Sequence, residues 1–423
     1  MEIKLNWEFI KAQLPAGWRE LAIERGLVRP QPPQLHAKVT DIEQVLRLVL
    51  HRVGLETSLQ TTTSTAAMAK EAIARAEGQE AAAGAKLLDL SPPALHYWER
   101  KLGSYLAELL ARMLDPSDMF SPLRWSGYEI VLTDGTTVTR PGAEGTTARV
   151  LYALRLADVT VLSCQVTDKH GGESMRVFEV HPGQLWMGDR LYSNPLDIAW
   201  VVDAGADVLV RYNLGALPLY DARGCPFDVM GHVRLYREPE EMAEWPVEVR
   251  PADHAPIQGR LCAVRLPEEQ AEKARERLRR EYGTNVSPQS LKAAAWLMVF
   301  TTAPPERMTS RQALELYRLR WQVELEIKRD KSIGGLDKLP NFREDTIATW
   351  LYAKLLIQQI ARKAVSLSVA FPPSPVDFDL LTGSQRNPRE AAPRQATRRH
   401  RTLAGHDSRL PGHSRGPASH RTA

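Results

Sequence analysis

Five short runs between residues 128 and 212 decide how this chain is expected to fold. They read YEIVLTD (128–134), VLYALRL (150–156), VTVLSCQV (159–166), QLWMGD (184–189) and DVLVRY (207–212). Each run is short and rich in β-branched or aromatic residues, which is typical of β-strands. Helical patterns follow only the third run (about 173–180) and the fourth (around Ile198 and Val201). We therefore predict an α/β fold whose mixed sheet is flanked by helices.

The rest of the chain divides into parts of different character. Residues 1–125 show helical spacing and predict an all-α domain, either a plain bundle or one that contains a helix-turn-helix. Residues 126–371 form the α/β domain, with a β-rich insertion at about 213–305. Residues 372–423 are rich in Pro, Arg and His, so we expect a disordered basic tail.

Charge is unevenly distributed along the chain. Lys and Arg number 55 against 51 Asp and Glu, a net charge of +4. Residues 382–423 hold nine Arg and two acids, so this segment carries +7 and the remainder carries −3. A charged fraction of 25% and an apolar fraction of 43% argue against a wholly disordered chain or a collagen.

The cysteines and apolar runs exclude further classes. Cys164, Cys225 and Cys262 are far apart and form no C-x-x-C pair, which excludes a disulfide scaffold and the common zinc motifs. No run resembles a signal peptide or approaches the roughly 20 apolar residues that span a bilayer. We expect a soluble, cytoplasmic protein with no membrane partner.

A long helix near residue 320 separates two neighbouring acids. A capping box at Thr309–Gln312 begins an amphipathic helix that runs to Lys331. At about 100° per residue, one face forms a buried seam, which consists of Leu316, Leu319, Val323 and Ile327. The adjacent stripe holds Tyr317, Arg320, Glu324, Lys328 and Lys331. Glu326 points about 160° away from Glu324. A solvated face with ordinary i,i+4 ion pairs would explain the same stripe.

Two aspartates each follow a predicted strand. Asp134 precedes Gly135 and Asp189 precedes Arg190, and a turn or a capped loop explains either one alone. Together with Glu324 they could hold two divalent cations, because Mg²⁺ prefers oxygen ligands. Two such ions about 4 Å apart activate an attacking oxygen and stabilise a leaving one in phosphodiester chemistry.

The spacing of Tyr317, Arg320, Glu324 and Lys331 matches the Y-x2-R-x3-E-x6-K signature of bacterial insertion-sequence DDE transposases. The chain resembles this family over about residues 10–365. LTDGTT (132–137) resembles the block around the first aspartate, and GES (172–174) with GDRLY (188–192) resembles the region of the second. The resemblance implies an RNase-H-like core, which has the strand and helix order given above. It also implies cut-and-paste DNA transposition with Mg²⁺, for which Mn²⁺ can substitute.

The resemblance also implies roles for single residues. Asp134, Asp189 and Glu324 become the catalytic, metal-binding triad. The implied DNA-binding residues are Tyr317, Arg320, Lys331, Arg211 and Trp296, where Trp296 stands at the position that stacks on a flipped base in hairpin-forming relatives. A core indole explains Trp296 equally well, and a surface charge explains Arg211.

The implied partners are double-stranded DNA, both as terminal inverted repeats and as target, and a second copy in a homodimeric synaptic complex. Such an enzyme is bacterial and associates with the nucleoid when it is bound to DNA. Two alternatives stay open: a catalytically silent copy that occupies the repeats as an inhibitor, and an RNase-H-like metal-dependent nuclease without strand transfer. The C-terminal tail is relevant to the inhibitor alternative. Relatives usually end in a helical segment used for synapsis, whereas this chain has a Pro-, Arg- and His-rich tail there.

Overall fold

A computed structural model describes residues 7–28, 39, 41–77, 90–114, 124–340 and 344–368. The chain divides into two units, Met1–Leu381 and Thr382–Ala423, and every described residue belongs to the first. The basic tail expected at 372–423 therefore lies outside the described residues. No helix in the described ranges is long and apolar enough to cross a membrane.

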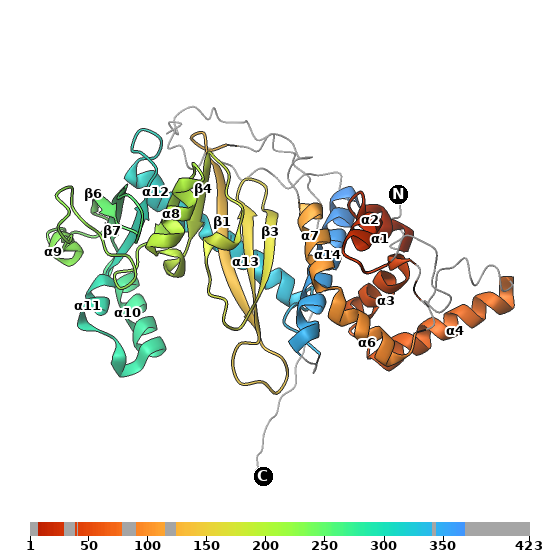
Figure 1. Ribbon diagram of the computed structural model, residues 1–423. Helices are drawn as coiled ribbons and strands as arrows, with labels where there is room; N and C mark the ends of the chain where they lie inside the picture. The colour runs from red at the N-terminus through yellow and green to blue at the C-terminus, as the bar shows by residue number, and fades with distance from the viewer. Residues whose placement is uncertain are drawn as a thin grey trace, which may run out of the picture. The chain divides into compact units, whose positions relative to one another are not determined.

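An eight-stranded mixed sheet forms the centre of the described structure (Figure 1). Its strands lie in the order β3-β2-β1-β4-β5-β8-β7-β6. Strands β1, β4 and β5 run parallel, whereas β2 and β3 are antiparallel to their neighbours. This order confirms the predicted RNase-H-like sheet, whose first strands are β1 (Glu129–Val138), β2 (Ala148–Arg155), β3 (Thr160–Asp168), β4 (Gln184–Gly188) and β5 (Asp207–Arg211).

The segment between β5 and helix α12 (Ser310–Tyr317) extends this sheet. Strand β8 (Trp296–Thr301) pairs with β5 on one side and with β7 (Ile257–Arg265) on the other. Strand β6 (Met242–Val249) closes the edge. The accompanying helices are α8 (Pro195–Asp203), which precedes β5, and then α9 (Val229–Val233), α10 (Glu268–Tyr282) and α11 (Pro288–Ala293).

Strand β1 is longer than the sequence predicts. We expected it to end at Asp134, because an Asp-Gly pair usually marks a turn, and that expectation is wrong. Strand β1 continues to Val138 because β2 keeps pairing with it as far as Ala148, although β4 pairs with it only to the level of Leu132. Asp134 therefore lies just beyond the level at which the neighbouring strand ends.

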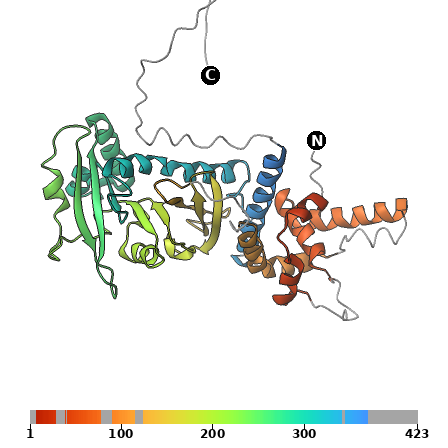
Figure 2. The same ribbon diagram turned by 90° about the horizontal axis from the view of Figure 1, so that it is seen from above.

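Helices flank the sheet beyond β3. Helix α14 (Ile347–Ser368) contacts α7 (Gly103–Leu114), α3 (Ile42–Gly54) and β3 (Figures 1 and 2). Helix α3 buries Ile42, Val45, Leu46 and Val49 on one face, as their spacing predicts. The remaining helices of this group are α1 (Trp7–Gln13), α2 (Trp18–Glu24), α4 (Leu59–Glu77) and α6 (Pro92–Lys101).

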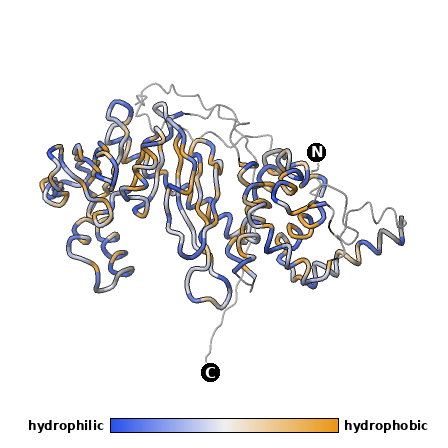
Figure 3. Tube along the Cα trace, in the orientation of Figure 1, coloured by the Kyte–Doolittle hydropathy of each residue, from blue (hydrophilic) through white to orange (hydrophobic). Residues whose placement is uncertain are grey.

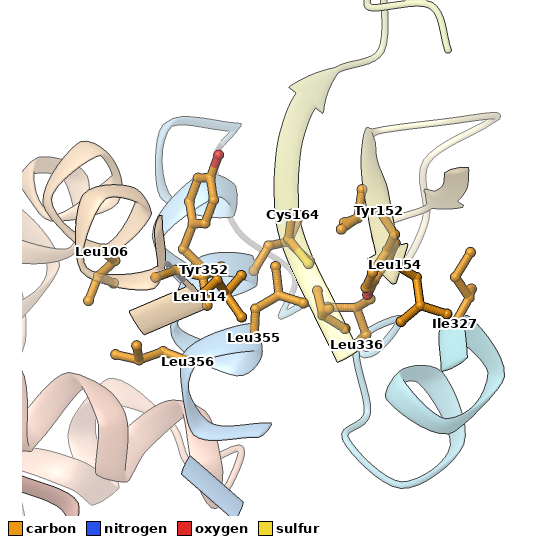
Figure 4. Packing of buried hydrophobic residues seen from close by; sticks show 14 of the residues in the cluster. Leu106, Leu114, Tyr152, Leu154, Cys164, Ile327, Leu336, Tyr352, Leu355 and Leu356 are labelled. Atoms are coloured by element: carbon orange, nitrogen blue, oxygen red, sulfur yellow. The ribbon is translucent and has the colours of Figure 1, made fainter. Parts of the chain in front are cut away.

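One hydrophobic cluster joins the N-terminal helices to the sheet. Apolar stretches follow the strands and the helices packed on them (Figure 3). In this cluster Leu106 of α7 and Leu355 of α14 pack near Cys164 of β3 and Leu154 of β2 (Figure 4). The cluster thus continues across the predicted boundary at residue 125, and the division into domains stays a prediction.

Candidate active site

The predicted catalytic helix forms in two pieces. Helix α12 (Ser310–Tyr317) begins with the predicted capping box, in which Thr309 and Gln312 hydrogen-bond each other's backbone. A 3₁₀ turn, η5 (Arg318–Arg320), leads into α13 (Trp321–Ser332). Most of the predicted seam is buried, namely Leu316, Val323 and Ile327. This burial fixes which face of the helix is turned to the sheet.

Arg320 links two of the three predicted catalytic carboxylates. Its Nη1 lies 3.2 Å from Oδ2 of Asp134 on β1, and its Nη2 donates to Oε1 of Glu324 one helical turn further along. The side chains of Arg320 and Asp134 are only 17% and 15% exposed. Asp134 and Glu324 are therefore held on opposite sides of one guanidinium, although they come from distant parts of the chain.

Asp189 lies beside Asp134 because β1 and β4 are parallel neighbours. It follows the last residue of β4 and caps the short turn η3 (Arg190–Tyr192), accepting a hydrogen bond of 2.7 Å from the Leu191 N–H. The capped-loop interpretation is therefore correct as local structure. It does not exclude a catalytic role, since the charge of Asp189 still acts on Asp134.

Burial and two neighbouring carboxylates raise the pKa of Asp134. Burial raises the pKa of Asp134 to about 6, and the negative charges of Asp189 and Glu324 act in the same direction. The Gly135 N–H, 2.8 Å away, and Arg320 partly offset this effect. Carboxylates whose charge is disfavoured by their neighbours are stabilised by a divalent cation, and oxygen-only donors suit a hard ion.

The residues present fit a divalent metal site by their chemistry, but they are not yet arranged around an ion. Within the described ranges, no three His, Cys, Asp or Glu side chains converge closely enough to hold a metal. The guanidinium of Arg320 stands between Asp134 and Glu324 and neutralises both. Metal binding by these two residues thus requires the Arg320 contacts to loosen.

Glu173 is an acid of this site that sequence reasoning did not single out. It was noted only as part of GES (172–174), at the start of a helix that the structure reduces to the 3₁₀ turn η2 (Met175–Val177). Burial, together with the negative charges of Asp134 and Asp189, raises the pKa of Glu173 to about 7. The GES block was the sequence signal that could have pointed to Glu173. The positions of its residues in the sequence do not show that the block lies against β1.

Three of the predicted DNA-binding residues, Arg211, Tyr317 and Arg320, lie near one another. Arg211 at the end of β5 lies half-buried, and burial together with Arg190, Arg320 and Arg277 lowers its pKa. Burial raises the pKa of Tyr317 to about 12, in a position close to Arg320 and Arg211. A group of cations that oppose one another's charge is a favourable site for phosphate.

Trp296 and Lys331, the other two predicted DNA-binding residues, have different surroundings. A cavity of about 720 Å³ is lined by Asp189, Arg211 and Trp296, together with Lys273 and Arg277 of α10. Trp296 is 5% exposed, so it is both a core residue and a wall of the cavity. The Lys331 Nζ lies 3.3 Å from the carbonyl oxygen of Thr137 on β1.

Glu326 faces the opposite side of the helix from Glu324, as predicted, but it is buried there. It pairs with Arg362 of α14 and, at 3.3 Å, with Arg329. Arg362 also lies 2.5 Å from Asp330, which accepts a hydrogen bond of 2.9 Å from Tyr152 of β2. Glu326 thus belongs to a network that ties α13 to α14 and to the sheet.

An RNase-H-like sheet, with acids at the level where its parallel strands β1 and β4 stop pairing and cations beside them, defines a class of enzymes that act on phosphodiester bonds. A family model described as a transposase DDE domain matches residues 125–359. InsL, for insertion sequence element IS186A of Escherichia coli K12, is 30% identical over 256 residues, which are 59% of this chain and 69% of that protein. The transposase for insertion sequence element IS421 of Escherichia coli matches to the same extent.

The chain belongs to the DDE transposases of bacterial insertion sequences. It is an enzyme that cleaves and joins DNA, and its chemistry depends on divalent metal ions. The piggyBac transposase synaptic complex with hairpin DNA aligns with 84% of this chain and 74% of that chain, at 8% identity and a TM-score of 0.35. This weak likeness adds nothing to the assignment.

Proposed function

We propose that this transposase moves its insertion sequence by a cut-and-paste route. Water attacks a phosphodiester at each terminal inverted repeat and breaks it, so that a 3′ hydroxyl is released. This 3′ hydroxyl then attacks a phosphodiester of the target DNA in the same active site, and the 3′ hydroxyl of the target strand leaves as the new bond forms. One observation carries this proposal: Arg320 holds Asp134 of β1 and Glu324 of α13 together, while Asp189 lies beside Asp134. These are the three residues that the signature and its two aspartate blocks single out.

Asp134, Asp189 and Glu324 are the proposed ligands of Mg²⁺, with Mn²⁺ as a substitute. The ions supply activation of the attacking oxygen and stabilisation of the leaving oxygen. The chain orients the carboxylates in advance, since the Gly135 N–H holds Asp134 and the Leu191 N–H holds Asp189. Each of these contacts leaves further carboxylate lone pairs free for a cation.

The cations and the indole around the triad are the proposed DNA contacts. Arg211, Arg320 and Tyr317 act on one another's charge, and together they are proposed to bind backbone phosphate. Lys331 extends this contact along α13 toward Thr137. Trp296 lines the basic cavity next to Asp189, where its ring offers a surface on which a base can stack.

Recognition of the repeats is proposed to rest on residues 1–125, with two copies of the chain forming the synaptic complex in the bacterial cytoplasm. Helix α14 packs against α7 and α3, so removing the N-terminal helices would expose apolar surface of α14. The intact chain is therefore the better reagent. Photocrosslinking it to a repeat-end duplex should label residues 1–125 in a sequence-dependent way, and labelling that ignores the repeat sequence would contradict this assignment.

Matched carboxylate variants test the triad. Asp134→Asn, Asp189→Asn and Glu324→Gln should bind a repeat-end duplex but neither nick nor join it in MgCl₂. Both steps share the same ions, whereas binding rests on cationic contacts elsewhere. Glu326→Gln is the control, because Glu326 faces Arg362 and not the site. Its cleavage should continue at a temperature well below its unfolding transition.

The readout is strand cleavage on a labelled duplex, with a gel-shift assay of the same samples. Normal cleavage by Glu324→Gln would overturn the triad. Loss of cleavage by the folded Glu326→Gln protein to the same degree would also overturn it, since the two positions would then be equivalent.

A further inference from the structure

The side chain of Glu173 lies against the backbone of Gly135, the residue after Asp134. A Cβ atom built on Gly135 would meet Cδ of Glu173 at 2.9 Å and Cγ at 3.0 Å. Only a residue without a side chain leaves room for this approach. Glu173 is consequently brought to β1 on the face of Gly135, which is opposite to the face of the Asp134 side chain, beyond the level at which β4 stops pairing with β1. Across this open edge, both Asp134 and Asp189 act on its charge.

Hydrogen bonds to helix α8 anchor the segment that carries Glu173. Asp197 of α8, which is 1% exposed, accepts hydrogen bonds from Ser174 Oγ at 2.6 Å and from the Met175 N–H at 3.2 Å. Arg176 Nε reaches the same carboxylate at 3.2 Å. The residues that follow Glu173 are therefore fixed to α8. This anchorage holds the residues next to Glu173 against α8, while Glu173 itself approaches β1.

Glu173 has no stabilising partner of its own within the described ranges. No hydrogen bond or ion pair reaches its carboxylate, and Arg149 acts on it only at longer range. A half-buried carboxylate beside two others is unfavourable unless a cation compensates it. Arg320 neutralises Asp134 and Glu324 but is not paired with Glu173.

A buried hydroxyl next to these acids also lacks a well-formed partner. Tyr192 is fully buried, and its ring packs against Gly188, where a Cβ would meet it at 2.8 Å. Its hydroxyl makes no well-formed hydrogen bond to the described residues, although Thr133 is its neighbour. Glu173, Asp134 and Asp189 all act on this hydroxyl. Polar groups buried in this way are normally completed by water or an ion.

We propose that Glu173 is a fourth carboxylate of the metal-binding set, and that it contributes to the ion or ions that Asp134 and Asp189 hold. The proposal rests on the assignment of the triad given above. It explains why an acid is anchored beside two others, and why Gly135 is the residue that leaves space for it.

Direct metal binding tests the proposal without any turnover. Mn²⁺ binding to the full chain is measured by electron paramagnetic resonance and calorimetry for Glu173→Gln, Glu179→Gln and Asp134→Asn. Glu179 is the matched control, because it lies in the same segment and is exposed. We expect Glu173→Gln to weaken Mn²⁺ binding about tenfold or more and Glu179→Gln to leave it unchanged. Gly135→Ala should also weaken it, because the added methyl would meet Glu173 at 2.9 Å and the buried Leu151 at 2.6 Å, so that both side chains must shift.

Thermal unfolding separates a metal ligand from a structural acid. In EDTA, Glu173→Gln should melt at or above the temperature of the unmodified protein, because one of several mutually repelling carboxylates is gone. Addition of MnCl₂ should raise the melting temperature of Glu173→Gln by less than that of the unmodified protein. Unchanged Mn²⁺ binding by Glu173→Gln, alongside lost binding by Asp134→Asn, would overturn this inference alone. Unchanged binding by Asp134→Asn would overturn the triad as well.

Discussion

The guanidinium of Arg320 lies 3.2 Å from the carboxylate of Asp134, a residue 186 positions earlier in the chain. The same guanidinium contacts Glu324, so a cation of the chain itself joins two of the carboxylates that are proposed to hold metal. This contact keeps the two acids together and partly neutral in the absence of an ion. It also means that a metal ion and Arg320 compete for the same oxygen atoms.

Replacing Arg320 should make the stability of the protein more dependent on metal. Arg320→Ala leaves Asp134 and Glu324 without their cation and should lower the free energy of unfolding in EDTA by about 1–2 kcal/mol. Saturating MnCl₂ should raise the melting temperature more in this variant than in the unmodified protein. Arg318→Ala, at an exposed position in the same turn, is the control. If MnCl₂ raises the melting temperature of both variants equally, Arg320 does not compete with the metal ion for Asp134 and Glu324.

Asp134 should contribute a recognisable pH dependence to the metal-free protein. Its pKa rises from 3.8 to about 6 on folding. The folded state then holds the proton more tightly than the unfolded chain, so this contribution is complete below about pH 4 and is lost as the pH rises through 6. Urea unfolding in EDTA should show Asp134→Asn gaining stability relative to the unmodified protein as the pH rises from about 4 to about 6. If the plots of unfolding free energy against pH run parallel for the variant and the unmodified protein, the pKa of Asp134 is not raised on folding.

Glu326→Gln should damage stability and leave the chemistry intact. The substitution removes the charge that faces Arg362, and we expect the free energy of unfolding to fall by about 1–3 kcal/mol. The control is Glu315→Gln on α12, whose ion pair with Arg311 is exposed and long at 3.7 Å. That control should change stability by less than about 0.5 kcal/mol. If Glu326→Gln is as stable as the control, the buried network does not bind α13 to α14.

The C-terminal arginines should govern non-specific DNA binding. Nine Arg between residues 382 and 423 can each neutralise a phosphate, which gives affinity without reading bases. Deleting residues 382–423 should flatten the plot of log affinity against log salt, by at most about 8 in slope. The preference for repeat ends over random DNA should persist. An unchanged slope would show that the tail does not contact DNA.

The sequence by itself determined the features that depend on neighbouring residues. Runs rich in β-branched and aromatic residues predicted the first five strands, and the capping box at Thr309 placed the start of the helical segment that carries Glu324. Helical periodicity also separated Glu324 from Glu326, because a residue two positions along a helix points about 160° away. Each of these signals acts over a few residues, so each can be read before the chain is folded.

Only the tertiary structure decided which distant groups meet. Strand β1 passes through Asp134 because β2 pairs beyond it, and Gly135 admits Glu173 because its missing side chain faces that acid. The partner of Glu326 is Arg362, on a helix whose approach depends on packing against α7 and α3. Spacing contains no information about such contacts. They arise when burial of apolar surface brings separate elements together. Each buried charge then pairs with a group of opposite charge on the element packed beside it.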